Sequence, residues 1–403
     1  YYIPSSLKKY KSEYIDNTSC RNAWVSFLKS SFILHSRMVK PELLTFYSGY
    51  NRKEIQIVPL DNTLYSGYTG ILVAYHLSGM PREIKDDMLN IETDVLRIVE
   101  NDYYRKETSI GLCGYSGIIY GLCISQAEHS IMYLENGSIV RDYCNFVANF
   151  IVNEQYQCGL YNGLCGSIIT MLAIEKFRSF NFNIDQIVTT LLSFQNRDGS
   201  WREDLCENSR VLERGLFHGI DGILLTLCGI HERNPATEIK LSLSLTLDYI
   251  ANQYINDPHY MNSKEYSWAS GFSGHLVAIT RCLKNGFGSP ILTEYLNNLI
   301  KLVSMSGLND DHSLISGKIG RILTLEYVDS IINGSNLVPE IDKIRLEILN
   351  YQERNKALDL TYYDENYLLA PSLGHGYSSF PALGNYKPTR VNPFIQCISF
   401  DDT

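Results

Sequence analysis

The chain lacks several features that would assign it to a familiar functional class. None of its 403 residues falls in an apolar run long enough to span a membrane, about 18 residues. Acidic residues outnumber basic ones and give a formal net charge of −9, whereas nucleic-acid binding requires a concentrated basic face. The sequence opens at Tyr1 without a recognisable signal peptide. We therefore predict a cytoplasmic protein with no membrane span and no nucleic-acid partner.

Paired cysteines are also missing. The chain has 10 cysteines, scattered along its length, and none forms a C-x-x-C pair. A chain of this size does not need a disulfide framework to fold. We therefore expect free thiols in a reducing cytosol.

A repeat is the most prominent feature that the sequence does contain. A G-x-x-G element followed by an apolar run occurs six times, and a seventh copy has serine in place of its second glycine. The first glycines lie 46 to 59 residues apart, at Gly67, Gly114, Gly163, Gly219, Gly271, Gly317 and Gly376. A unit of about 50 residues accommodates two helices and their connections at ordinary helix and loop lengths.

The two expected helices of a unit differ in their patterns. The stretch after each G-x-x-G is apolar nearly all round, which is typical of a buried helix. Amphipathic stretches such as 86–100 and 290–303 lie between them and fit an outer layer. Glycines at the start of the inner helices allow close backbone approach where many helices converge. We predict an all-α fold, an (α/α) toroid of seven inner and seven outer helices over residues 56–403, preceded by a helical extension over residues 1–55.

Three repeats carry a family resemblance. The segments 216–222 (LFHGIDG), 267–271 (SWASG) and 313–317 (SLISG) resemble repeats four, five and six of the lanthionine synthetase C-like family. The likeness runs in order from about Asp61 to the end of the chain. It implies a double ring of helices and an enzyme that adds cysteine thiols to dehydroalanine or dehydrobutyrine in a precursor peptide, giving thioether rings.

The ligands of the family's zinc-dependent members are absent. Those members read Trp-Cys-x-Gly in the fifth repeat and Cys-His-Gly in the sixth, where Ala269, Ile315 and Ser316 stand here. A catalytic zinc site needs three protein ligands, and alanine and isoleucine side chains cannot coordinate a metal. The family's acidic residue of the third repeat falls near Gly159, and its arginine near Glu265. We therefore predict no metal and no cofactor.

Loss of these ligands does not by itself imply loss of activity. The segments 62–72 and 159–166 resemble the cyclase domains of kinase-containing (class III) lanthipeptide synthetases, which lack the same ligands and make lanthionine or labionin rings. This chain has no room for the kinase and lyase parts that dehydrate the peptide. We expect those parts on a portion of the chain before Tyr1 or on a partner protein.

The residue before each first glycine is expected to face the central mouth of the ring. These residues are small and polar, a thiol or an imidazole: Ser66, Cys113, Asn162, His218, Ser270, Ser316 and His375. His218 matches the family histidine that handles the enolate proton, and histidine titrates near neutral pH, so it is the first catalytic candidate and His375 the second. Helix N-capping is an equally good explanation for the serines and the asparagine, and a small buried side chain for Cys113.

Four further residues complete the predicted site. Without a metal, helix dipoles would stabilise thiolate and enolate, and we hypothesise that Lys318 partly replaces the metal's charge; a solvated loop lysine is the alternative. Asp221 either orients the His218 imidazole or caps its helix. Trp268 and Arg321 join the polar residues Ser66, Asn162, Ser270 and Ser316 as predicted substrate-binding residues, although core packing also explains Trp268.

Two other functions are compatible with the sequence. A catalytically degenerate relative that binds leader peptide or scaffolds a modification complex would explain the lost ligands, whereas His218 and the polar mouth oppose it. The segment 195–201 (QNRDGSW) resembles the Q-x-x-D-G-S-W repeat of terpene-cyclase-like rings. It occurs only once here, and neither D-x-D-D nor D-D-x-x-D is present.

Overall fold

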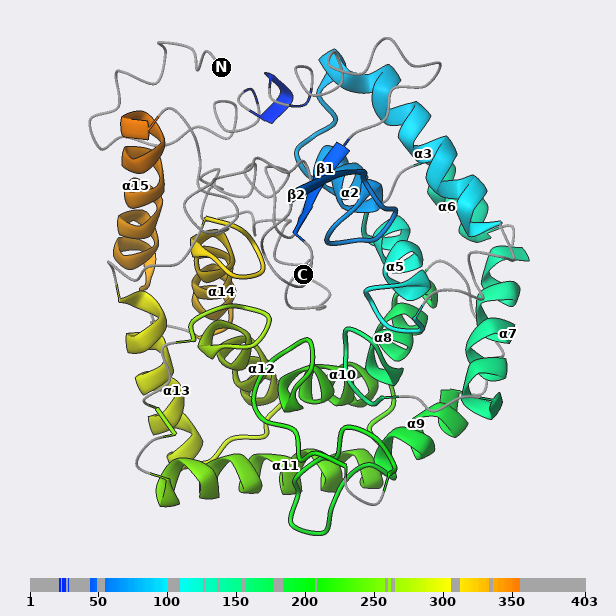
Figure 1. Ribbon diagram of the computed structural model, residues 1–403. Coiled ribbons are helices and arrows are strands. Elements are labelled where there is room, and N and C mark those ends of the chain that lie inside the picture. Colours follow the sequence, from blue (N-terminus) through cyan, green and yellow to red (C-terminus); the bar gives the residue numbers. More distant parts are fainter. Residues whose placement is uncertain are drawn as a thin grey trace.

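The computed structural model of this protein is a ring built from two layers of helices (Figure 1). It describes residues 22, 24–26, 28, 44–48, 55–100, 109–125, 128–135, 138–153, 157–176, 184–206, 209–257, 260–261, 265–305, 312–332 and 336–355. The seventh repeat, with Gly376 and the catalytic candidate His375, lies outside these residues.

Six inner helices begin directly after the first glycine of a G-x-x-G element. They are α2 (Tyr68–Leu77), α5 (Tyr115–Ser125), α8 (Leu164–Ile174), α10 (Ile220–Arg233), α12 (Phe272–Lys284) and α14 (Lys318–Ile331). Each packs against the next one in chain order. Their side chains are almost all buried, as the apolar pattern after each G-x-x-G predicts.

An outer helix follows each inner helix. The outer helices are α3 (Lys85–Val99), α7 (Ser138–Asn153), α9 (Ile184–Leu192), α11 (Thr237–Asn256), α13 (Pro290–Ser304) and α15 (Val338–Asn355), with η2 (Arg82–Ile84) and α6 (Glu128–Glu135) as short connecting helices. Figure 1 shows them outside the inner ring. The amphipathic stretches 86–100 and 290–303 coincide with α3 and α13. The predicted all-α toroid is confirmed, and its hydrophobic core lies between the two layers.

The glycines of the repeat are needed because backbones pass very close to them. A Cβ atom at Gly117 would lie 1.9 Å from the Leu112 carbonyl oxygen, and one at Gly274 would lie 2.0 Å from that of Trp268. The first glycine of a repeat has an extended backbone, for example φ −129° and ψ −164° at Gly163, which any residue can adopt. Space, rather than unusual backbone conformation, therefore requires glycine at these positions.

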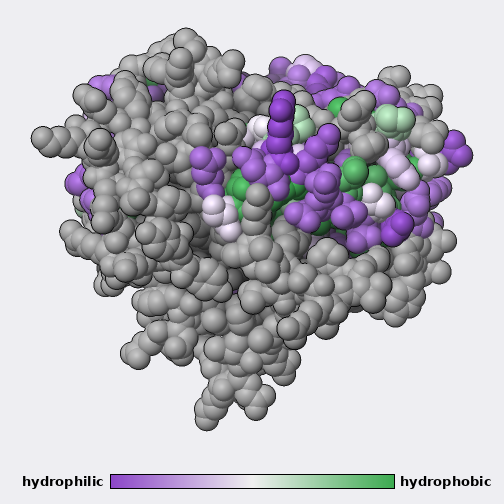
Figure 2. All heavy atoms as spheres, turned by 90° about the horizontal axis from the view of Figure 1, so that it is seen from above, coloured by the Kyte–Doolittle hydropathy of each residue, from purple (hydrophilic) through white to green (hydrophobic). Residues whose placement is uncertain are grey.

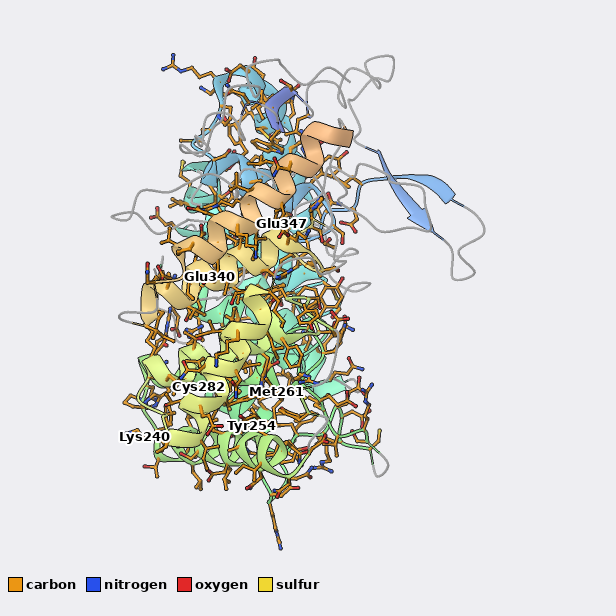
Figure 3. The ribbon with its side chains drawn as sticks, turned by 90° about the vertical axis from the view of Figure 1, so that its left-hand side faces the viewer. Lys240, Tyr254, Met261, Cys282, Glu340 and Glu347 are labelled. Carbon is orange, nitrogen blue, oxygen red and sulfur yellow. The ribbon has the colours of Figure 1, made fainter. Side chains whose placement is uncertain are left out.

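The N-terminal region departs from the predicted helical extension. Leu44–Ser48 and Ile55–Pro59 form the antiparallel strands β1 and β2, with Leu44 opposite Pro59 and Ser48 opposite Ile55. The hairpin projects away from the helices (Figure 3). Within the predicted extension, residues 44–48 are thus a strand instead of a helix, because they combine β-branched and aromatic side chains, which favour strands.

One face of the molecule shows mostly polar side chains among the residues that the structure describes. Seen from the top of Figure 1, hydrophilic side chains predominate, with small hydrophobic areas between them (Figure 2). Among the described helices, none is both long and apolar enough to cross a membrane.

Candidate functional site

The loops that precede the inner helices are joined to one another by backbone hydrogen bonds. The Cys113 amide donates to the Tyr161 carbonyl (2.9 Å), Tyr161 to Phe217 (2.9 Å), Phe217 to Ala269 (3.0 Å) and Ala269 to Ile315 (3.2 Å). Five repeats are thus tied side by side just before their inner helices start. The N-terminal ends of these helices therefore converge at one end of the ring, which we call the mouth.

Four aromatic side chains from these loops pack together beneath the mouth. The rings of Tyr161 and Phe217 stack with centroids 4.5 Å apart, and Trp268 meets Phe217 edge-on at 5.1 Å. Tyr65 contacts both Phe217 (5.3 Å) and Trp268 (5.7 Å). We call these four residues the aromatic floor; such offset and edge contacts are favourable ring geometries. Trp268 is fully buried in it, so its predicted contact with substrate is wrong, and core packing is its role.

The residues before the first glycines form a polar rim above this floor. Asn162, His218 and Ser270 are exposed and Ser66, Cys113 and Ser316 are half-buried, whereas most residues flanking them are buried. The structure therefore brings together six of the seven residues that the repeat placed at the mouth.

The N-capping alternative is not supported for the rim. The glycines that follow Ser66, Asn162, Ser270 and Ser316 are themselves the N-cap residues of α2, α8, α12 and α14, and no side chain caps these helices. The Ser270 hydroxyl instead lies 3.1 Å from that of Ser267. The side chains of the rim are thus not explained by helix capping.

His218 combines an exposed position with a perturbed titration. Its imidazole packs edge-on against the Tyr161 ring, with centroids 5.3 Å apart. Partial desolvation in this position lowers the pKa of His218, and the Glu203 carboxylate opposes that effect. The side chain is therefore neutral at pH 7 and able to accept a proton from a group at the mouth.

Gly159, near which the resemblance places the family's acidic residue, lies beside His218. A Cβ atom at Gly159 would lie 3.1 Å from the Phe217 carbonyl oxygen and 3.7 Å from the Cα of His218. Glu203 acts electrostatically on His218, and its carboxylate accepts a hydrogen bond of 3.1 Å from the Gln157 side chain. Sequence reasoning missed Glu203 because it lies in a loop far from any G-x-x-G element.

Cys113 and Asn162 link two neighbouring repeats across the mouth. The Cys113 thiol donates to Asn162 Oδ1 at 2.8 Å, and the Ser109 hydroxyl donates to the Asn162 carbonyl at 2.9 Å. Burial raises the pKa of Cys113. This cysteine is therefore a protonated, hydrogen-bonded thiol at neutral pH and a weak nucleophile.

Asp221 does not bond to the His218 imidazole directly, and it does not cap its helix. It is fully buried, its Oδ1 lies 2.5 Å from His275 Nδ1, and its Oδ2 accepts a 2.6 Å hydrogen bond from the Gly215 amide. Gly219, not Asp221, is the N-cap residue of α10. The physical reason is helix geometry: residue 221 lies within the first turn and faces α12, whereas His218 precedes the helix and faces solvent.

Lys318 and Arg321, the two cationic candidates of the sixth repeat, bond to groups on α15 and at the end of α13. The Lys318 amine lies 3.4 Å from a carboxylate oxygen of Glu347, which is labelled on α15 in Figure 3, so its charge is paired, and its role in place of the metal's charge stays a hypothesis. The buried Arg321 guanidinium donates to the Val303 carbonyl at 2.8 and 3.1 Å and also to that of Met305. It satisfies the C-terminal end of α13 and does not reach the mouth, which corrects its predicted contact with substrate.

Ala269, Ile315 and Ser316, which the resemblance matches to the zinc ligands, lie close together without supplying ligands. The Trp268 and Ala269 amides both donate to the Ile315 carbonyl, at 2.9 and 3.2 Å. Ala269 has a methyl group, Ile315 a buried butyl group and Ser316 a hydroxymethyl group, and these side chains do not fit zinc. No group of three or more potential ligands from His, Cys, Asp and Glu occurs among the residues that the structure describes.

The segment 195–201 has a structural role. The Gln195 amide and the Trp201 indole both donate to the Thr246 hydroxyl, each at 2.9 Å. A Cβ atom at Gly199 would lie 2.0 Å from the Leu245 carbonyl oxygen. The segment is thus fastened to α11, which accounts for the motif without terpene-cyclase chemistry.

Comparisons with known proteins agree with this architecture. Among solved structures, nisin cyclase has a TM-score of 0.64 at 15% sequence identity, covering 96% of this chain and 98% of its own. Possible members of the GH105 family from Klebsiella pneumoniae and Salmonella enterica reach TM-scores of only 0.37 and 0.36, at 10% and 11% identity. They cover 79% and 89% of this chain and 88% and 100% of their own. No curated protein matches.

A family model described as "Lanthionine synthetase C-like protein" matches residues 58–378, which include all six described G-x-x-G repeats and the mouth. The resemblance carried by segments 216–222, 267–271 and 313–317 is therefore confirmed at the level of the whole ring. Because the match extends over most of the sequence, the chain belongs to the lanthionine synthetase C-like family.

Proposed function

We propose that this protein is a zinc-independent cyclase that adds cysteine thiols to dehydroalanine or dehydrobutyrine in a precursor peptide, forming lanthionine or labionin rings. The observation that carries the proposal is His218, an exposed imidazole with a lowered pKa at a polar mouth above an aromatic floor. A neutral imidazole can act as the general base in such an addition.

The proposed reaction moves one proton through His218. A ring nitrogen takes the proton from a cysteine thiol of the peptide, and the thiolate sulfur forms a bond to the β-carbon of the dehydro residue. The electron pair of the C=C bond shifts to give an enolate. The imidazolium then returns its proton to the α-carbon, which completes the thioether and restores neutral His218.

The convergent inner helices supply electrostatic stabilisation for both anions. Each helix N-terminus is equivalent to roughly half a positive charge, and its effect is strongest within the first turn. α5, α8, α10, α12 and α14 all start just below the mouth, as the hydrogen-bonded loops require. Thiolate and enolate formed next to His218 would therefore lie in a positive potential that needs no metal.

The proposal extends to the partners of the reaction. The dehydro residues must be made before cyclisation, so we propose kinase and lyase activities on a further part of the same polypeptide or on a partner protein. The aromatic floor would shield the reacting atoms from water on the ring side and leave access from the open side of the mouth.

One set of observations favours a second candidate, a non-catalytic relative that binds leader peptide or scaffolds a modification complex. Gly159, Ala269 and Ile315 replace groups that take part in the chemistry of zinc-dependent members, and Lys318 is paired with Glu347. A binding protein could tolerate all of these changes. It would, however, have no need for a proton-transfer group at His218.

The test is incubation with a dehydrated precursor peptide that retains one free cysteine, with and without a zinc chelator. Thiol alkylation followed by mass spectrometry counts the cysteines that remain, against a control without protein for spontaneous addition. We expect faster loss of the free thiol than in that control and no effect of the chelator. Loss of the acceleration on adding the chelator would overturn the proposal. A rate equal to the control without protein, with peptide binding intact, would also overturn it and would favour the binding role.

A matched pair of variants assigns the activity to the mouth. His218→Gln should abolish accelerated cyclisation while leaving peptide binding unchanged. His231→Gln is the control, because His231 lies at the far end of α10, the helix that follows His218, and its pKa is also lowered by burial. Equal losses in both variants would show that the effect of His218→Gln is not specific to proton transfer.

A further inference from the structure

A buried acid–base pair that the proposed mechanism does not use lies directly below the mouth. Asp221 of α10 and His275 of α12 are both fully buried, and Asp221 Oδ1 lies 2.5 Å from His275 Nδ1. The opposite side of the imidazole packs edge-on against the Tyr295 ring of α13, at 5.4 Å. Burying a carboxylate is costly unless its oxygens are well hydrogen-bonded, so an apolar pair would hold these helices together equally well.

The second oxygen of Asp221 reaches the loop that carries His218. It accepts a 2.6 Å hydrogen bond from the amide of Gly215, three residues before His218. Gly215 has φ +133°, a conformation that L-residues rarely adopt, and a Cβ atom there would lie 3.1 Å from the Cα of Ser270. Glycine adopts this conformation freely, whereas any other residue would be strained here, so the start of the loop has a backbone path that depends on Gly215.

The residue before Gly215 is also fixed. The Arg214 guanidinium lies 4.4 Å above the Phe272 ring and donates to the Tyr260 carbonyl at 2.6 Å. At the other end of the loop, the Phe217 amide donates to Ala269. The segment that presents His218 is thus tied at both ends, and the Asp221 carboxylate forms the tie that lies deepest in the core.

We propose that Asp221 and His275 form a positioning pair, which fixes the loop from Gly215 to His218 and so sets the place of the His218 imidazole at the mouth. This inference rests on the proposed function, since it assigns the pair to the placement of the proton-transfer group. His275 donates its Nδ1–H to Asp221, Asp221 accepts from Gly215, and neither side chain touches substrate.

Loss of the positioning pair has a defined consequence for His218. The imidazole owes its lowered pKa to partial desolvation beside Tyr161, with Glu203 as the charged group that opposes the shift. A loosened loop would expose the ring further, and its pKa would rise towards the ordinary value of about 6.5. Because a misplacement of about 1 Å can cost roughly 100-fold in rate, we expect kcat to fall about 10- to 100-fold with little change in KM.

Substitutions of graded severity separate positioning from packing. Asp221→Asn and His275→Asn each retain an amide that can continue the hydrogen-bonded chain, whereas Asp221→Leu and His275→Leu remove it. Arg281→Met is the matched control, because the Arg281–Glu232 ion pair (2.8 Å) joins the same two helices at their ends away from the mouth. Gly215→Ala leaves the pair intact and disturbs the loop itself, which covers the case in which the leucine variants do not fold.

The first readout is independent of catalysis. The His218 imidazole is titrated by NMR in the full chain labelled at histidine Cε1, and its signal is assigned by its absence in His218→Gln. We expect a raised His218 pKa in Asp221→Leu, His275→Leu and Gly215→Ala, and values near wild type in both asparagine variants and in Arg281→Met. Unchanged His218 titration in the folded leucine variants and in Gly215→Ala would overturn the positioning role.

The second readout is cyclisation, with kcat and KM measured for the dehydrated peptide. The variants that raise the His218 pKa should lose kcat, and the asparagine variants should regain it. An equal loss of kcat in Arg281→Met would mean that general destabilisation is the cause and would also overturn the inference. If the wild-type protein does not cyclise the peptide, the proposed function fails, while the titration still tests whether the pair places His218.

Discussion

Replacing Gly274 by alanine tests why the repeat needs its second glycine. Gly274 lies in the first turn of α12, where alanine would ordinarily be the better helix former by about 1 kcal/mol. Here the added Cβ atom would lie 2.0 Å from the Trp268 carbonyl oxygen and 2.9 Å from two carbons of the Leu216 side chain. The predicted effect therefore has the opposite sign to that of helix propensity.

The size of the effect follows from the closest contact. Carbon and carbonyl oxygen atoms normally approach to about 3.3 Å, so the two backbones would have to separate by more than about 1 Å. Both atoms belong to tightly packed segments, because the Trp268 amide is itself bonded to Ile315 in the next repeat. Overpacking of this kind costs about 1–3 kcal/mol and sometimes more, so we expect Gly274→Ala to lower the free energy of unfolding by about 2–4 kcal/mol.

Urea unfolding followed by circular dichroism measures this change. At an m-value of roughly 3 kcal/mol/M, the midpoint should fall by about 1 M. Gly288→Ala is the control, because a Cβ atom there meets only the Leu283 side chain, at 3.2 Å, and we expect a change of about 0.5 kcal/mol or less. If Gly274→Ala is as stable as wild type or more so, the close backbone approach is not what requires glycine.

Three further predictions concern the mouth and the residues excluded from it. The cyclisation rate should rise with pH as the His218 imidazole loses its proton and becomes available as a base, and because burial lowers its pKa, this rise should occur below neutral pH. His218→Gln should remove this limb from a pH–rate profile. Among the described cysteines, Cys206 should react with iodoacetamide before Cys113, because Cys206 is exposed and Cys113 is half-buried and hydrogen-bonded. Peptide mapping of a labelling time course measures the order, and labelling of Cys113 first would contradict this expectation. Lys318→Met should leave cyclisation unchanged and lower the free energy of unfolding by at most about 1 kcal/mol. Arg321→Met should lower it by about 2–4 kcal/mol in urea unfolding, because carbonyls at the end of α13 lose their hydrogen-bond donor. A selective loss of activity in either variant would support its predicted site role.

The rim could be predicted because it depends on a pattern local to each repeat. The residue before the first glycine has the same relation to its inner helix every time, so one inference placed Ser66, Asn162 and His218 correctly. Side chains inside the helices could not be assigned in this way. Asp221 and Arg321 are each only a few residues from the mouth in sequence, but a helix rotates successive side chains by about 100°, which directs them to α12 and α13 instead.

Contacts between separate elements could not be predicted from the sequence either. The Lys318–Glu347 ion pair and the proximity of Glu203 to His218 join residues from different elements, and no spacing in the sequence encodes them. The hairpin of β1 and β2 differs in this respect, since the strand-favouring composition of 44–48 and 55–59 is a local signal that lies before the first repeat.

The sequence by itself determined the toroid, through a glycine pair and an apolar run repeated at near-constant spacing, and it determined that positions 269, 315 and 316 cannot supply zinc ligands. Only the tertiary structure decided that Arg321 points away from the mouth, that Trp268 is buried in the aromatic floor, and that Asp221 binds His275 and Gly215. The physical reason is that repeat spacing fixes where backbones meet, whereas the partner of a buried charge depends on which helices pack against it.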